Sequence, residues 1–234
     1  MEFNERVVIV TGASGNLGRA VVKAFQERGA RMVLFEMHRE HLEQAFGSET
    51  EGMRFAALNL LESSQVEAAV KATVARFGRV DALANLAGGF KMGSPVHATS
   101  DAEWNFLLDL NARTVLNTAR AVVPRMLERG GGKIVNIGAF GAQKGAAQMG
   151  AYVASKAVVI RLTETMAAEL REKNINVNCV LPTTLDTPQN RAAMPDADPR
   201  RWVATEDLAN VIVFLCSDAA RAIHGAAIPV TGLS

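Results

Sequence analysis

The chain has 234 residues, of which 49% are hydrophobic, and 25 Lys and Arg residues nearly balance 24 Asp and Glu residues. This length suffices for one α/β domain with a sizeable core, so we expect a single domain over residues 1–234. The balanced charge, with no basic block, argues against nucleic acid as a partner. No apolar run reaches the roughly 18–20 residues of a membrane span.

Short apolar runs alternate with amphipathic segments along the whole chain. The runs read as buried strands are 6–10, 32–35, 53–58, 80–86, 133–137, 175–181 and 226–230. The segments read as helices are 16–28, 38–46, 62–77, 101–128, 151–173 and 205–217. Strand–helix alternation favours right-handed crossovers, so the pattern predicts an α/β, doubly wound parallel sheet of about seven strands with helices on both faces.

Cap and turn residues agree with these boundaries. Ser100 and Glu103 predict a capping box at the start of helix 101–128. Gly29, Gly78 and Gly130 each follow a helical segment, where a left-handed residue is favoured. Within helix 101–128, Pro124 should kink or restart the helix.

A glycine-rich turn follows the first strand and opens the first helix. Its spacing, G-x-x-G-x-x-G, permits a tight turn and a close approach of the backbone to a pyrophosphate, which the free N–H groups of the helix would bind. A purely structural turn is the alternative. The residues expected to contact a dinucleotide here are Gly12, Ser14, Gly15, Asn16, Leu17 and Gly18.

Glu36 ends the second strand, where a carboxylate can accept hydrogen bonds from both ribose hydroxyls of NAD. The 2′-phosphate of NADP would meet like charge there. His38 and Arg39 follow and would soften that exclusion. The sequence therefore favours NAD (NADH) over NADP as the cofactor.

Tyr152 is the only tyrosine in the chain and lies four residues before Lys156. Residues at this spacing share one face of a helix. A nearby ammonium should lower the phenol pKa from about 10, which would make the pair a general acid/base. A surface tyrosine beside a surface lysine is the unremarkable alternative.

Together these motifs resemble the short-chain dehydrogenase/reductase family. The residues that carry the resemblance are Thr11–Gly18, Asn85–Gly88, Asn111 and Tyr152–Lys156, in an order that covers essentially the whole chain. The family implies a Rossmann-like fold, a bound NAD(P), hydride transfer to or from a small molecule, and a homodimer or homotetramer assembled through helices 101–128 and 151–173.

Position in the family pattern assigns further roles. Tyr152, Lys156 and Asn111 would be catalytic, and Asn111 would hold a water molecule in a proton relay. Thr187 would reach the nicotinamide amide. The remaining cofactor contacts that the resemblance implies are Asn59, Leu60, Asn85, Ala87, Gly88, Pro182, Thr184 and Leu185, together with Tyr152 and Lys156.

One position departs from the family pattern. Most members carry a serine a dozen or so residues before the tyrosine, but Gly138 and Ala139 occupy that place and cannot donate a side-chain hydrogen bond. Gln143 and Gln148 are the candidates to replace that donor. Otherwise the protein is a weak or inactive reductase, or its substrate needs only one donor.

The dihydropteridine reductase branch of the family resembles this chain in the same absence. Two further features of this chain resemble that branch, namely the Pro-rich segment 181–202 and an aromatic residue, Phe90, after the glycines. We expect the Pro-rich segment to be an irregular lid or binding loop. A quinonoid dihydropterin accepts hydride readily, so Tyr152 alone would suffice as acid. The alternatives are a 3-oxoacyl or general carbonyl reductase and a non-catalytic dinucleotide-binding sensor.

The remaining signals concern location and metals. The first residues lead directly into a strand, without the layout of a signal peptide. Cys179 and Cys216 lie in apolar stretches, which favours buried free thiols in a cytoplasmic protein over a disulfide. The histidines share no ligand-like pattern with cysteines or carboxylates, so no metal site is predicted.

Overall fold

A computed structural model describes residues 3–234 and contains one seven-stranded sheet. Its strands are β1 Val7–Thr11, β2 Arg31–Glu36, β3 Met53–Ala57, β4 Ala82–Asn85, β5 Gly132–Ile137, β6 Ile175–Pro182 and β7 Ala227–Val230. They run parallel in the order β3-β2-β1-β4-β5-β6-β7. The prediction of a Rossmann-like sheet is confirmed, with strand ends shifted by at most two residues.

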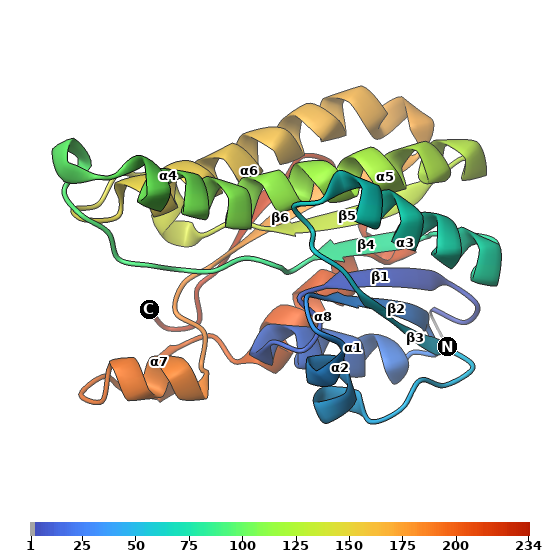
Figure 1. Ribbon diagram of the computed structural model, residues 1–234, viewed down its shortest axis with the longest axis horizontal. Coiled ribbons are helices and arrows are strands. Elements are labelled where there is room, and N and C mark those ends of the chain that lie inside the picture. Colours follow the sequence, from blue (N-terminus) through green and yellow to red (C-terminus); the bar gives the residue numbers. More distant parts are fainter. Residues whose placement is uncertain (1–2) are drawn as a thin grey trace.

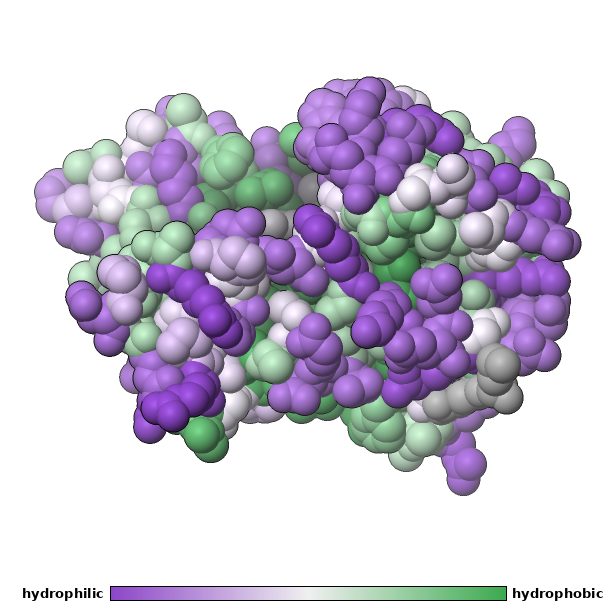
Figure 2. All heavy atoms as spheres, turned by 90° about the horizontal axis from the view of Figure 1, so that it is seen from below, coloured by the Kyte–Doolittle hydropathy of each residue, from purple (hydrophilic) through white to green (hydrophobic). Residues whose placement is uncertain are grey.

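Helices cover both faces of this sheet (Figure 1). They are α1 Asn16–Gln26, α2 Arg39–Phe46, α3 Ser63–Phe77, α4 Asp101–Leu108, α5 Thr114–Arg129, α6 Gly150–Leu170, α7 Pro188–Ala193 and α8 Thr205–Leu215. In Figure 1, α3, α5 and α6 lie above the sheet, and α1, α2 and α8 lie below it. The lower side is mostly hydrophilic, with smaller hydrophobic areas between the hydrophilic residues (Figure 2).

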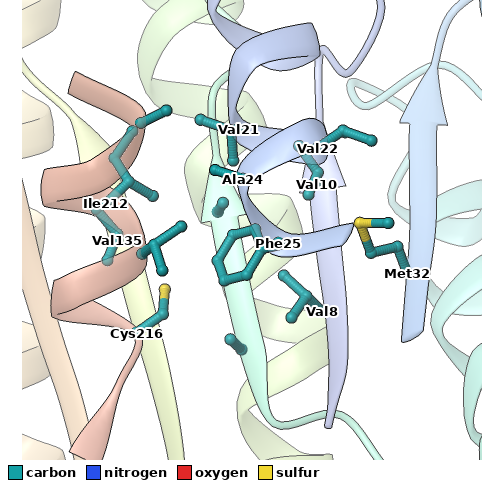
Figure 3. Close-up of a cluster of buried hydrophobic side chains, with 14 of the residues drawn as sticks. Val8, Val10, Val21, Val22, Ala24, Phe25, Met32, Val135, Ile212 and Cys216 are labelled. Atoms are coloured by element: carbon teal, nitrogen blue, oxygen red, sulfur yellow. The ribbon is translucent and has the colours of Figure 1, made fainter. Parts of the chain in front are cut away.

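Strand alternation divides the core into two layers. Val8 and Val10 of β1 face α1 and α8, whereas Ile9 between them packs with the opposite layer under α3 and α5. Phe25 of α1 is fully buried at the centre of the first layer (Figure 3). Both faces of the central strands are therefore apolar, as a sheet covered on both sides requires.

The predicted helix 101–128 is helical throughout, but a turn within it is not α-helical. A π-helical turn, Asp109–Arg113, separates α4 from α5, and α5 continues through Pro124. The helix therefore does not restart at Pro124, and the irregular turn lies at Asn111 instead. The position of this turn at Asn111 matters because π-helical turns are frequently found at functional sites.

Two smaller expectations need correction and one is confirmed. Ser100 caps α4 by accepting a hydrogen bond from the Glu103 amide at 3.2 Å, but the Glu103 carboxylate accepts from Ser94 N–H, so the reciprocal half of the box is missing. The segment 182–202 contains α7 and is only partly irregular. Gly29, Gly78 and Gly130 have φ of +82°, +77° and +82°, as predicted.

Two findings bear on the expectations about membranes and thiols. None of the helices within residues 3–234 has the length and apolarity needed to cross a lipid bilayer. Cys179 and Cys216 are buried free thiols, as the sequence predicts.

Candidate active site

The candidate site lies at the carboxyl edge of the sheet, where the strand order reverses between β1 and β4. Crevices of this kind are the usual ligand sites of open α/β sheets. Residues that follow β1, β2, β4 and β5 meet there, together with the first turn of α6. The predicted site residues thus come from segments far apart in sequence.

The glycine turn leaves no room for side chains at two positions. Gly12 has φ +62°, and a Cβ on it would lie 3.0 Å from the Ala87 backbone. A Cβ on Gly18 would lie 2.3 Å from the Gly12 carbonyl oxygen. Gly15 precedes α1 with no side-chain cap, so the first N–H groups of the helix are available to an anion. This cradle fits the pyrophosphate of a dinucleotide.

Residues of the turn also hold one another. Arg19 Nε donates to the Ser14 carbonyl oxygen at 2.7 Å, and Leu17 packs against the core. Asn16 Nδ2 donates to Gln189 Oε1 of α7 at 2.7 Å. This bond joins the turn to the Pro-rich segment, which thereby lies beside the nucleotide end of the site.

Glu36 is fixed at the end of β2. Its carboxylate accepts hydrogen bonds from Ser14 Oγ at 2.6 Å, Ser14 N–H at 3.2 Å and Met37 N–H at 2.9 Å. Arg39, which the sequence offered as a partner for a 2′-phosphate, instead pairs with Glu43 at 2.9 Å and Glu49 at 3.4 Å. The carboxylate beside the turn is therefore not neutralised by that arginine.

Three of the residues expected to contact the cofactor bind the protein itself. Asn85 is 3% exposed, and its amide bonds Asn136 and Thr118, each at 2.9 Å. Asn59 Oδ1 accepts from Leu61 N–H at 3.0 Å, and the Leu60 carbonyl oxygen accepts from Asn117 Nδ2 at 2.9 Å. The Asn85 amide is thus structural, because it is buried inside the sheet network.

Sequence reasoning missed several polar residues that shape this edge. Thr11 Oγ1 accepts from the amides of Leu86 at 3.0 Å and Ala87 at 3.1 Å, which fixes the backbone after β4. Asn136, Asn117 and Thr118 are likewise buried. The available signal was the polar residue in an otherwise apolar strand or helix face, since buried polar groups need partners.

Tyr152 and Lys156 lie on one face of α6, as their spacing predicts. Lys156 is 5% exposed, and its Nζ donates to the Ile137 carbonyl oxygen at 3.0 Å. Within the part of the chain that the structure describes, no hydrogen bond engages the phenol. The phenol is therefore available to a ligand.

The expectation that Lys156 lowers the tyrosine pKa is wrong for the protein without ligand. Burial raises the pKa of Tyr152 to about 12. Burial also lowers the pKa of Lys156 to about 8, despite an opposing effect of Cys179. Desolvation dominates because both charged forms lose water in this edge of the fold. At neutral pH the phenol is thus a neutral proton donor.

Asn111 lies in the π-helical turn and touches the loop after β4. Its Oδ1 accepts from Gly89 N–H at 2.9 Å, and its Nδ2 donates to the Gly89 carbonyl oxygen at 3.1 Å and to Ser155 Oγ at 3.0 Å. A Cβ on Gly88 would lie 2.7 Å from Asn111 Oδ1 and 3.1 Å from Lys156 Nζ. The loop, Asn111 and Lys156 are therefore packed without spare space.

Ala139 occupies the place where most of the family carries serine. It is 5% exposed and belongs to an apolar cluster with Val115, Ala142, Val159, Ile160, Cys179 and Leu181. Gln143 Nε2 donates to the Phe140 carbonyl oxygen at 3.3 Å, and the Gln148 carbonyl oxygen accepts from Gly93 N–H. Nothing in these contacts directs either glutamine side chain to the phenol, so a replacement donor is not supported.

The segment after β6 is ordered by its own hydrogen bonds. Thr187 Oγ1 caps α7 by accepting from Asn190 N–H at 3.2 Å. Leu185 pairs with Val203 as an isolated bridge, and the Thr184 carbonyl oxygen accepts from Val203 N–H at 2.9 Å. Pro182 ends β6. These bonds order the segment, which begins at the carboxyl end of β6.

Comparisons with known proteins identify the family. The short chain dehydrogenase profile matches residues 6–198. D-threitol dehydrogenase of Mycolicibacterium smegmatis is 32% identical over 97% of this chain and 92% of its own. A 3-oxoacyl-[acyl-carrier-protein] reductase of Thermotoga maritima is 30% identical over 99% of this chain and 98% of its own.

Solved structures agree with this result. NAD+-bound xylitol dehydrogenase superposes with a TM-score of 0.91 at 29% identity, covering 99% of this chain and all of that one. Levodione reductase gives 0.88 at 28% identity, covering 98% and 97%. The chain is therefore a member of the short-chain dehydrogenase/reductase family, whose enzymes are NAD(P)-dependent oxidoreductases.

Proposed function

We propose that this protein is an NADH-dependent reductase that transfers hydride to a conjugated imine or carbonyl of a small molecule, with a quinonoid dihydropteridine as the first candidate. The observation that carries this choice is the buried methyl group of Ala139 beside the site, where a second donor would otherwise stand. A substrate that gains aromatic stabilisation on accepting hydride needs less polarisation than a simple ketone.

The residues of this chain supply the proton and the positioning. Tyr152, whose phenol stays protonated at neutral pH, donates its proton to the substrate nitrogen or oxygen. Bound NADH would supply the hydride. Lys156 supplies a positive charge beside the phenol and a donor for the nicotinamide ribose. Asn111 holds the loop against Lys156 through its two bonds to Gly89. We further propose that Asn111 holds the water molecule that returns a proton to Tyr152.

The glycine turn and Glu36 support NADH as the partner of this reaction. The cradle formed by Gly12, Gly18 and the start of α1 suits a pyrophosphate. Glu36 suits the ribose hydroxyls and opposes a 2′-phosphate, because Arg39, three residues after it, is already paired with Glu43. Thr184, Leu185 and Thr187 would close over the nicotinamide end.

A second candidate function is reduction of a 3-oxoacyl thioester or a general carbonyl compound. Its support is the similarity to relatives named as a 3-oxoacyl-[acyl-carrier-protein] reductase and a levodione reductase. The loss of one placed donor argues against it, since such a donor contributes roughly 2.7–4 kcal/mol in comparable sites. A non-catalytic dinucleotide sensor has less support, because binding alone needs no Tyr152–Lys156 pair.

Location and assembly form part of the same proposal. The two buried free thiols support a reducing, cytoplasmic setting. Exposed large apolar side chains on α4, α5 and α6 support a homodimer or homotetramer built on these helices. They are Trp104, Phe106, Leu127 and Val158.

A substrate and cofactor screen tests the proposal. Quinonoid dihydropterin, quinones and 3-oxoacyl thioesters are each offered with NADH and with NADPH. Turnover of the conjugated substrates at a kcat/KM at least tenfold above the thioesters, with NADH preferred, is the expected result. Preference for the thioesters would establish the second candidate, and NADH binding without turnover of any substrate would establish the sensor.

A further inference from the structure

Phe90 lies in the loop after β4, and its ring packs against the ring of Tyr152. The ring centroids are 4.9 Å apart at an interplanar angle of 87°, an edge-to-face contact. Phe90 is nevertheless 58% exposed. An aromatic residue that is more than half exposed is thus held directly beside the candidate proton donor.

The loop that carries Phe90 is held in place by the π-helical turn. Asn111 bonds both backbone groups of Gly89, at 2.9 and 3.1 Å. A Cβ on Gly89 would lie 3.0 Å from Leu110 Cδ2, so this backbone is packed tightly against the π-helical turn. Asn111 therefore fixes the backbone next to Phe90. The same asparagine also lies close to Gly88, which in turn lies close to Lys156.

From this geometry we propose that Phe90 is a specificity-determining residue, an aromatic wall of the substrate site that selects flat, conjugated ring compounds. A flat substrate can cover the open part of the ring by stacking or edge contact while its reacting atom reaches the phenol. An open-chain carbonyl compound has no π face to offer and gains only small apolar contacts. This inference rests on the proposed reductase function.

Two vicinal dicarbonyl compounds separate ring recognition from carbonyl chemistry. Phenanthrenequinone is flat and conjugated, whereas 2,3-butanedione is a short open chain. The variants are Phe90→Leu, which keeps apolar bulk, Phe90→Ala, which removes it, and Phe90→Trp, which keeps a flat ring. Met92→Ala is the matched control, since Met92 lies two residues along the same loop and is also about half exposed.

With NADH saturating, Phe90→Leu and Phe90→Ala should lower kcat/KM for phenanthrenequinone by about tenfold and for 2,3-butanedione by less than twofold. Phe90→Trp and Met92→Ala should stay within about threefold of wild type on both. An equal loss on both substrates, or no loss on the quinone, would overturn the inference.

A binding measurement tests the role of Phe90 independently of whether the proposed reductase function is correct. Calorimetric titration of the NADH-loaded protein with fully oxidised biopterin needs no turnover. A Kd about tenfold weaker in Phe90→Leu than in wild type supports the aromatic wall even if the substrate screen fails. The same Kd in both proteins, or no binding to wild type, overturns it even if the screen succeeds.

Discussion

Lys156 donates a 3.0 Å hydrogen bond to the carbonyl oxygen of Ile137, the last residue of β5, from a position that is 5% exposed. This bond holds the ammonium inside the carboxyl edge of the sheet, one helical turn along α6 from Tyr152. The charge is kept in a poorly solvated place, which is costly for folding and useful beside a proton donor.

That cost should be visible in the pH dependence of stability. The pKa of Lys156 is about 8 when folded and about 10.5 when unfolded. The unfolded chain thus binds more protons between these values, and stability rises with pH through that window. Relative to Lys156→Met, the free energy of unfolding of wild type should increase by about 2–3 kcal/mol from pH 7 to pH 10.

Urea unfolding of both proteins at the two pH values provides the measurement. The difference between them cancels titrations that Lys156 does not influence, including that of Cys216. Cys179 is the exception, because the charge of Lys156 lowers its pKa, and a third protein, Cys179→Ala, measures that contribution. A difference that stays constant from pH 7 to pH 10 would show that the buried ammonium is not desolvated as the structure indicates.

Gly18→Ala should remove both stability and dinucleotide binding. The added Cβ would lie 2.3 Å from the Gly12 carbonyl oxygen and 2.4 Å from that of Ala13, and backbone atoms cannot move aside cheaply. We expect a loss of roughly 1–3 kcal/mol in unfolding free energy and a Kd for NADH at least tenfold weaker. Gly52→Ala is the control, because a Cβ there meets nothing within 4 Å; equal behaviour of the two variants would contradict the cradle.

Glu36→Ala should relax the choice between the two dinucleotides. Removal of the carboxylate would take away the proposed ribose partner and the charge proposed to oppose a 2′-phosphate. The ratio of NADPH to NADH affinity should rise about tenfold or more in equilibrium titrations. Glu40→Ala removes the same charge from an exposed site on α2 and should leave the ratio unchanged. If the ratio of NADPH to NADH affinity rises equally in both variants, the cause is the change in net charge and not the position of Glu36.

Ala139→Ser restores a hydroxyl next to the phenol. If the missing donor decides the substrate class, kcat/KM for 3-oxoacyl thioesters should rise roughly tenfold or more, while that for quinonoid dihydropterin should change less than threefold. Ala142→Ser, a second buried alanine of the same cluster, serves as the control. No gain with thioesters would mean that Ala139 does not set the preference.

The sequence predicts the sheet well because a short run of apolar residues is visible in the local sequence and marks a buried strand. All seven apolar runs are strands, and the Tyr152–Lys156 spacing alone puts the pair on one helical face. Helix α7 within segment 182–202 is not predicted, although Thr187 followed by Pro188 is a recognisable helix cap and first turn.

What the sequence does not predict depends on tertiary contacts. The π-helical turn at Asn111 is tied to the Gly89 loop, 22 residues away, and no local signal reports that bond. Asn85 resembles a cofactor contact by position, yet its amide completes a buried network with Asn136 and Thr118. The tyrosine pKa was predicted from charge alone, whereas desolvation decides it.

The most direct test of the account is single-turnover reduction by Tyr152→Phe with NADH bound beforehand. If the phenol donates the proton, the rate with the best substrate of the screen should fall by about 10²–10⁴-fold, while the Kd for NADH stays within twofold of wild type. An unchanged rate with unchanged NADH binding would contradict the account, since the proton would then come from another group.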